Sequence, residues 1–236
     1  ESQQTDEKEK DEKQPDEKKV KKISETIKVE PLSIFAIQMG AFSTEENAKE
    51  LAEEIQTRSG GGYIIKDEYY RVLAVGYMAE GDTNKVKEQL KEQNIESQVY
   101  RISCPGANMQ VTASSEKIEG VKSAYSLWRA QIEDMENIVK DLDGQAITGD
   151  KAHSKIVDMR DEMEDKLSEI REYKAAEESG AILSGLENIY KEGLSTLDKL
   201  IEENYQNEVA FSSKIKYTYI EMIYIYKNYM DGIVNT

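Results

Sequence analysis

SIFAIQMGAFSTEENAKELAEEIQ, residues 33–56, changes within a few positions from the period of a β-strand to that of an α-helix. Its first residues alternate between two faces, and after Gly40 the apolar residues recur at helical spacing. A helix is expected to begin at Ser43 or Thr44, because both residue types cap helix N-termini. Gln38 is the exception in the strand: a polar side chain among apolar ones, which needs an explanation.

Residues 31–104 continue this alternation. The pattern predicts strands at residues 33–39, on both sides of a tight turn near residues 67–68, and at residues 97–102, with a second helix at about residues 82–93. Two helices on one face of a four-stranded sheet bury the apolar stripes most simply. Gln38 then points, with Ile34 and Ala36, to the opposite face, which we expect to be open.

Two short motifs in this region resemble a known family. IQMGAF (residues 37–42) and YRVLAVG (residues 70–76), each followed by a helix, resemble the signature of the SPOR domain, the sporulation-related repeat of bacterial cell-division and cell-envelope proteins. The resemblance covers about residues 32–103. It implies a ferredoxin-like (RNP-like) βαββαβ fold that binds peptidoglycan, preferring glycan strands stripped of stem peptides by amidases at the septum. In that family the glycan lies across the open sheet face and touches the glutamine of the first strand, which implies this role for Gln38.

Four neighbours of Gln38 are further candidates for glycan contact. They are Tyr70, Arg71, Gln98 and Tyr100. Side-chain amides offer donors and acceptors for sugar hydroxyls and N-acetyl groups, and tyrosines add flat apolar area with a polar tip. The planar guanidinium of Arg71 suits the lactyl carboxylate of muramic acid. The second motif is one residue longer than the family's pattern, which predicts a β-bulge or a register change near Arg71 and Val72.

The remaining segments differ in composition from this α+β region. Residues 1–30 are highly charged and poor in apolar side chains, so we expect a disordered, charged tether. Residues 105–113 are expected to be a linker. Residues 114–236 carry four helical patterns, which predict an all-α antiparallel helical bundle, with the connection from its second to its third helix near Ser179 and Gly180.

The last predicted helix is apolar or tyrosyl nearly all round. Tyrosines stand in or just before it at positions 205, 217, 219, 224, 226 and 229. They cannot all point into a small core, because buried hydroxyl groups need partners. Two explanations stay open: this helix is central in the bundle, or its aromatic face meets a partner or a second copy of the chain.

Composition disfavours several classes of function. The formal net charge is −16 and the pI is about 4.7, so nucleic acid is an unexpected partner. The single Cys104 allows no internal disulfide and no site of several thiolates, and the single His153 disfavours a zinc hydrolase. We therefore expect no catalytic residue, metal or cofactor.

The resemblance implies a non-catalytic protein of the bacterial cell envelope that binds peptidoglycan glycan strands during division or sporulation. Its bundle is expected to be a spacer or to bind an envelope protein. The chain begins at Glu1 rather than Met, so we expect further residues upstream. The resemblance implies that these include a membrane anchor, and that the protein lies on the extracytoplasmic side and is enriched at the septum. Two alternatives stay open: a cell-wall remodelling enzyme, and a scaffold whose bundle binds a division or sporulation protein.

Overall fold

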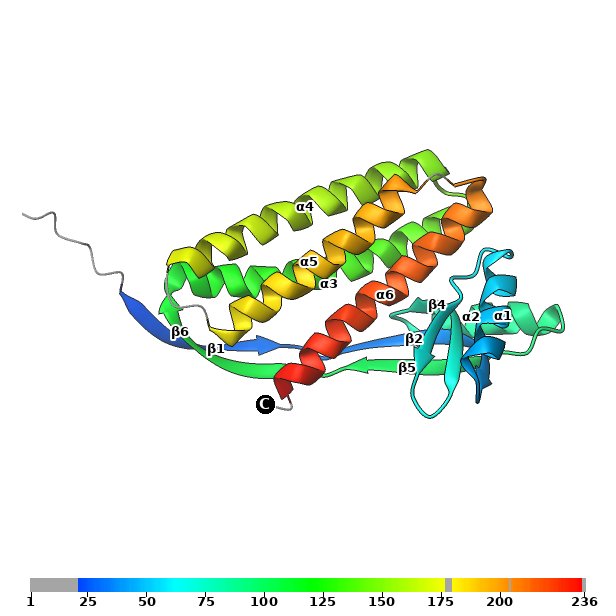
Figure 1. Cartoon of the computed structure of the whole chain (residues 1–236), viewed down its shortest axis with the longest axis horizontal. Coiled ribbons are helices and arrows are strands. Elements are labelled where there is room, and N and C mark those ends of the chain that lie inside the picture. Colours follow the sequence, from blue (N-terminus) through cyan, green and yellow to red (C-terminus); the bar gives the residue numbers. More distant parts are fainter. Residues whose placement is uncertain (1–20, 177–179, 204, 235–236) are drawn as a thin grey trace, which may run out of the picture.

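The computed structural model describes residues 21–176, 180–203 and 205–234 of the chain (Figure 1). The strands are β1 (Lys22–Val29), β2 (Leu32–Phe42), β3 (Tyr63–Lys66), β4 (Tyr70–Tyr77), β5 (Gln98–Cys104) and β6 (Ala107–Ser114). The helices are α1 (Glu45–Gln56), α2 (Glu80–Glu92), α3 (Ser115–Asp143), α4 (Gly149–Ala176), α5 (Ala181–Glu202) and α6 (Glu208–Val234). Within these ranges, none of the helices has the length and apolar character needed to cross a membrane.

The strands β2 to β5 form an antiparallel sheet with the order β3-β4-β2-β5. Helix α1 follows β2, and α2 follows β4, so each half of this unit is a strand, a helix and a strand. Ala48, Ala52 and Ile55 form the buried stripe of α1. The predicted ferredoxin-like βαββαβ fold, followed by helices, is confirmed.

The pairing of β2 with β4 contains the irregularity that the length of the second motif predicts. The register shifts at Gln38, which pairs with Leu73 although the preceding residue of β2 pairs with Val75. Ala74 of β4 is thus left unpaired, and a second shift leaves Met39 of β2 unpaired, because Gly40 pairs with Val72. The two shifts cancel, so a local irregularity like a β-bulge lies directly beside Gln38, but the register beyond it is the same as before it.

A two-stranded sheet extends the four-stranded one along the bundle (Figure 1). β1 pairs with β6, and Ile27 and Val29 of β1 are buried with Met109 of β6 in the core on which α3 packs. The prediction of a disordered tether is therefore wrong for residues 22–29, and that of a linker is wrong for residues 107–113. Burial of one apolar face against α3 offsets the cost of ordering these two strands. Residues 1–20 lie outside the described residues.

The four long helices form the predicted antiparallel bundle, in which α3 and α5 each contact α4 and α6. Its core contains Trp128, which stacks on Tyr226 and meets Tyr190 edge-on. Helix α5 begins directly after Gly180, whereas Ser179 of the predicted connection lies outside the described residues.

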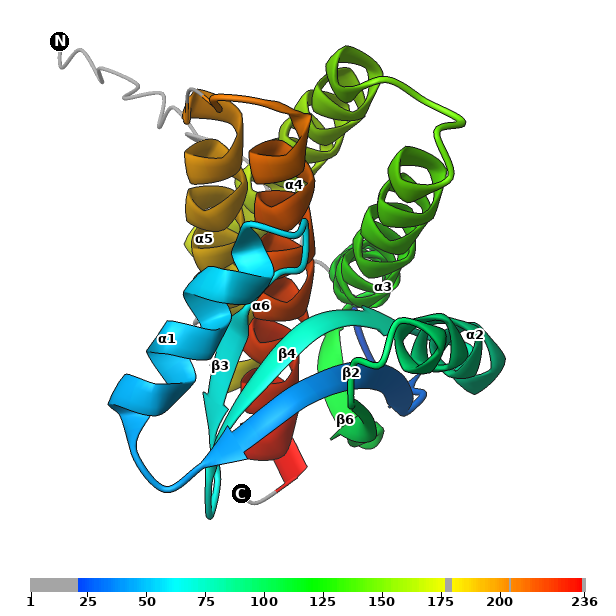
Figure 2. The same ribbon diagram turned by 90° about the vertical axis from the view of Figure 1, so that its right-hand side faces the viewer.

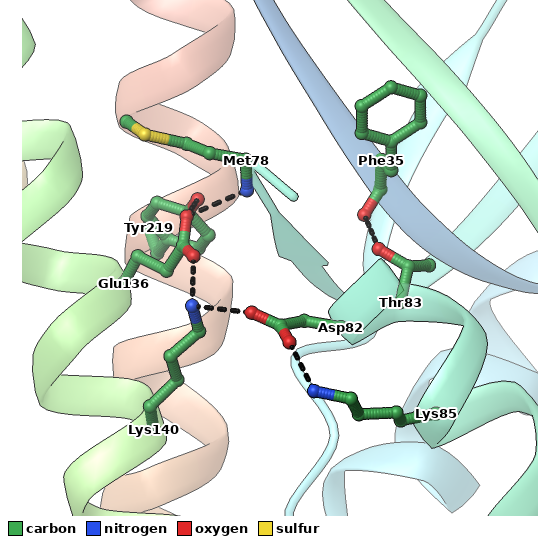
Figure 3. A network of polar contacts seen from close by, with 8 residues as sticks. All are labelled: Phe35, Met78, Asp82, Thr83, Lys85, Glu136, Lys140 and Tyr219. Atoms are coloured by element: carbon green, nitrogen blue, oxygen red, sulfur yellow. Dashed lines mark hydrogen bonds and ion pairs between the residues drawn. The ribbon is translucent and has the colours of Figure 1, made fainter. Parts of the chain in front are cut away.

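A polar cluster joins the sheet unit to the bundle (Figure 3). Glu136 of α3, only 4% exposed, accepts hydrogen bonds from the backbone N–H of Met78 at 2.7 Å and from Tyr219 at 3.1 Å. Lys140 pairs with Glu136 at 2.6 Å and with Asp82 of α2 at 2.8 Å. Because a buried charge that loses its partner costs about 3–5 kcal/mol, these contacts favour one relative position of the two units.

Candidate functional site

Gln38 lies near the end of β2, beside the bulge, and is 7% exposed. Its Oε1 atom accepts a hydrogen bond from Nη1 of Arg71 at 3.0 Å. Arg71 therefore shares the face of Gln38, whereas its neighbour Val72 is fully buried and, by the alternation of a strand, points to the other face. This contact shows that Arg71, and not Val72, is the residue of the second motif that lies beside Gln38.

Arg71 is held from several sides. Its Nε atom donates to Asp67 at 2.7 Å, and its guanidinium lies 5.5 Å from the ring centre of Tyr69 and 5.3 Å from that of Tyr100. The hydrogen bond from Arg71 holds the pKa of Asp67 below its usual range, and the same bond raises the pKa of Arg71. The guanidinium is therefore charged and fixed in direction.

The remaining predicted residues divide between the two faces. Gln98 pairs with Gln38 across the sheet and is exposed, and the hydroxyl of Tyr100 donates to Asp67 at 3.4 Å. Tyr70 precedes Arg71 in β4 and so points to the opposite face, where Lys66 lies 4.0 Å from its ring centre. Four of the five predicted residues are thus brought together, and Tyr70 is not.

A groove of about 980 Å³ opens at this end of the sheet. Gln38, Arg71 and Gln98 line it, together with the half-exposed Tyr69. Its opposite wall comes from the end of α2 and the segment that follows, including Lys87, Lys91, Asn94 and Ser97. The groove therefore combines amides, an aromatic ring and three cationic side chains with one acidic side chain, Glu96.

The sheet face next to this groove is not open. Helix α6 contacts β3, β4 and β5, and Figure 2 shows it on the side of the sheet away from α1. Tyr63 of β3 stacks on Tyr224 of α6 at 5.6 Å and meets Tyr217 edge-on at 5.0 Å. Ile34 and Ala36, which share this face with Gln38, are 0% exposed. The prediction of an open sheet face is therefore wrong; only at the end of the sheet does this face border the groove, where Gln98 is exposed and Gln38 is 7% exposed.

The same packing answers the question raised by the tyrosines of the last helix. Tyr219 and Tyr226 are fully buried within the bundle, whereas Tyr217 and Tyr224 pack on the sheet. The two predicted alternatives were a helix central in the bundle and an aromatic face that meets another molecule, and neither includes packing against the sheet. The aromatic face of α6 meets another part of its own chain.

Sequence reasoning also misses Tyr69, Lys87 and Lys91 in the groove. Lys87 and Lys91 are four residues apart and so share a face of α2, but this spacing is common on exposed helices. The sequence contains a clearer signal that α6 covers the second face of the sheet. Strand β2 is apolar on both faces, which is typical of a strand buried on both sides.

The other chemically reactive side chains lie apart from the groove. Cys104 is 1% exposed at the end of β5, and burial raises the pKa of its thiol to about 11. His153 lies in α4, where its Nε2 atom is 3.3 Å from the carbonyl oxygen of Ile201. Among the residues that the structure describes, no group of three or more His, Cys, Asp or Glu side chains is placed to hold a metal ion.

Comparison with known families agrees with the geometry of the sheet unit. The family model that matches is that of the SPOR domain, over residues 31–101. No curated protein and no solved structure matches the chain. SPOR domains are non-catalytic domains of division proteins that bind peptidoglycan on the extracytoplasmic side, at the septum. The predicted family is confirmed: residues 31–101 of this chain are a SPOR domain.

Proposed function

We propose that this protein binds peptidoglycan glycan strands without cleaving them, and that the strand lies in the groove beside Gln38. The match to a peptidoglycan-binding domain supports the ligand class. The hydrogen-bonded pair of Gln38 and Arg71 at the uncovered end of the sheet supports the place. The rest of this face is occupied by α6, so the proposed site is shorter than an open sheet face.

The chemistry of the groove suits a glycan strand. The amides of Gln38 and Gln98 suit sugar hydroxyls and N-acetyl groups, and the half-exposed ring of Tyr69 offers a flat apolar surface. Arg71, Lys87 and Lys91 outnumber Glu96, the one acidic side chain that lines the groove, although Arg71 is already paired with Asp67. Removal of the stem peptide frees the lactyl carboxylate of muramic acid, so we propose a preference for stripped strands.

The location and the bundle's partner belong to the same proposal. We propose that the protein works on the extracytoplasmic side and is enriched at the septum, where stripped strands form. A membrane anchor upstream of Glu1 and an envelope protein that binds the bundle stay predictions. A spacer role for the bundle has less support, because α6 lies against the sheet instead of holding it at a distance.

An enzymatic role is the weaker alternative, and it depends on the bundle, because the SPOR domain itself is a binding domain. Cys104, with its raised pKa and its burial, is poorly suited to act as a nucleophile. Release of labelled fragments from sacculi by the purified chain would decide for an enzyme.

The proposal is tested by sedimentation with purified sacculi, intact and amidase-treated. We compare the full chain with Gln38→Ala and with Gln110→Ala, which removes the same side chain from an exposed position in β6. We expect the full chain and Gln110→Ala to pellet equally with treated sacculi. Gln38→Ala should bind about three- to tenfold more weakly, because one or two hydrogen bonds are lost. Equal pelleting of both variants, with folding intact, would place the site elsewhere.

A further inference from the structure

The three cationic side chains that line the groove differ in how far their charges are already paired. Arg71 donates from Nε to Asp67 at 2.7 Å and from Nη1 to Gln38 at 3.0 Å. The carboxylate of Asp67 offsets the charge of the guanidinium at close range, so a second carboxylate gains little attraction there. Arg71 is therefore better suited to hold the amide of Gln38 than to attract an anionic ligand.

The two lysines of the opposite wall come from the last two turns of α2. Lys91 is exposed, lies in the last turn and has the carboxylate of Glu88 at 3.8 Å. Lys87 lies one turn earlier, is half-buried, and has no ion-pair partner within the part of the chain that the structure describes. Partial burial strengthens the attraction of an anion to Lys87, because less water screens its charge. Of the three cations, Lys87 has the charge most available to a ligand.

The proposed ligand carries a group whose charge depends on the stem peptide. The lactyl carboxyl of muramic acid is a neutral amide while the peptide is attached, and it becomes a carboxylate when an amidase removes the peptide. A cation that faces this group distinguishes the two states, whereas the amides of the groove bind sugar hydroxyls and N-acetyl groups in both. Glu96 lines the same groove and repels an anion, so the carboxylate should lie nearer to Lys87 than to Glu96.

We propose that Lys87 is the specificity-determining residue of the groove: its ammonium group pairs with the lactyl carboxylate of a stripped strand, while Gln38, held by Arg71, binds the neutral groups. This inference rests on the function proposed above and assigns its preference for stripped strands to one residue. Lys87 belongs to α2, whereas Gln38 and Gln98 belong to the sheet. The glycan therefore lies between helix and sheet, and its affinity and its selectivity depend on different walls of the groove.

The test uses soluble glycan fragments without stem peptides in two forms, one with free lactyl carboxylates and one with the same groups converted to amides. We compare the full chain with Lys87→Gln and with Lys85→Gln, which removes the same charge from an exposed position of α2 that does not line the groove. Wild type and Lys85→Gln should bind the free acid about threefold to tenfold more tightly than the amide, the effect of one partly buried ion pair. Lys87→Gln should bind both forms as wild type binds the amide, and Lys87→Arg should keep the preference.

Two further variants and the salt concentration separate selectivity from affinity. Gln38→Ala and Arg71→Gln should weaken the binding of both forms alike, and high salt should reduce the preference of wild type, because salt screens the ion pair. The Tm of Lys87→Gln should stay within a few degrees of wild type, so that lost selectivity does not report unfolding.

The outcomes distinguish this inference from the function on which it rests. A Lys87→Gln variant that keeps the preference of wild type would overturn the inference, and so would a loss of preference found in Arg71→Gln alone. If wild type binds both forms equally and Gln38→Ala weakens both, the proposed site stands and the role of Lys87 falls. If wild type binds neither form, the proposed function falls with it.

Discussion

One face of the four-stranded sheet carries two regions of opposite character. The covered part lies under α6 and consists of Ile34, Ala36, Leu73 and Ile102, all 0–1% exposed. The polar part consists of Gln38, Arg71 and Gln98 and borders the groove. Within β5, Ile102 and Gln98 point to the same face and belong to different parts. On this sheet, therefore, only the surface that the rest of the chain leaves free is available to a ligand.

The largest difference between the covered part and the polar part is expected when one residue of each is truncated within β5. Ile102→Ala should lower the free energy of unfolding by about 2–5 kcal/mol, because it leaves a cavity beneath α6. Gln98→Ala removes an exposed side chain and should change it by less than about 0.5 kcal/mol. Urea denaturation of both variants measures the difference. Similar small losses in the two variants would mean that α6 does not seal the covered part.

A smaller effect is expected where the loop before β3 touches α6. A Cβ atom at Gly61 would lie 2.9 Å from the backbone nitrogen of Tyr217, so Gly61→Ala should cost about 1–3 kcal/mol. Gly81 in α2 has no atom within 4 Å of such a Cβ, and Gly81→Ala should stabilise the protein by about 0.4–1 kcal/mol. Thermal unfolding should shift in opposite directions. A Gly61→Ala variant as stable as Gly81→Ala would contradict the close approach of α6.

The smallest expected effect concerns pH. Hydrogen bonds from Lys140, and then from Lys85, lower the pKa of Asp82 to about 2, from an ordinary value of 3.8. A lowered pKa in the folded state adds stability that is complete above the ordinary value and is lost as the pH falls toward 2. Asp82→Asn should therefore show a shallower loss of Tm than wild type between about pH 4 and pH 2. Parallel curves for the two proteins would mean that the link between α2 and α3 in Figure 3 adds nothing in solution.

Local patterns were sufficient to predict the sheet unit and part of its site. The two motifs contain the strand, glycine and helix signals of one βαββαβ unit, and strand alternation is enough to place Gln38 on the face away from α1 and α2. The same alternation, applied strictly, separates Tyr70 from Arg71, since adjacent residues in a strand cannot share a face.

Long-range packing explains what the patterns do not reveal. The apolar residues of β1 stand among charged ones, and their partner strand β6 is distant in sequence, so a local window resembles a disordered segment. The position of α6 depends on tertiary contacts between helix tyrosines and Tyr63, which no periodicity encodes. The sequence did contain one signal for this packing, at Ile34 and Ala36. Apolar residues on both faces of a strand indicate that other elements pack on both faces.

We propose that glycan binds at the polar part of the face while α6 stays in place over the covered part. NMR mapping of the full chain, titrated with soluble, stem-peptide-free glycan fragments, tests both halves of this proposal at once. We expect shifts in the side-chain amides of Gln38 and Gln98 and in the Arg71 Nε–H group, with the backbone amides of Ile102 and Tyr217 unchanged. Large shifts along α6 and the covered part would show instead that glycan displaces the helix.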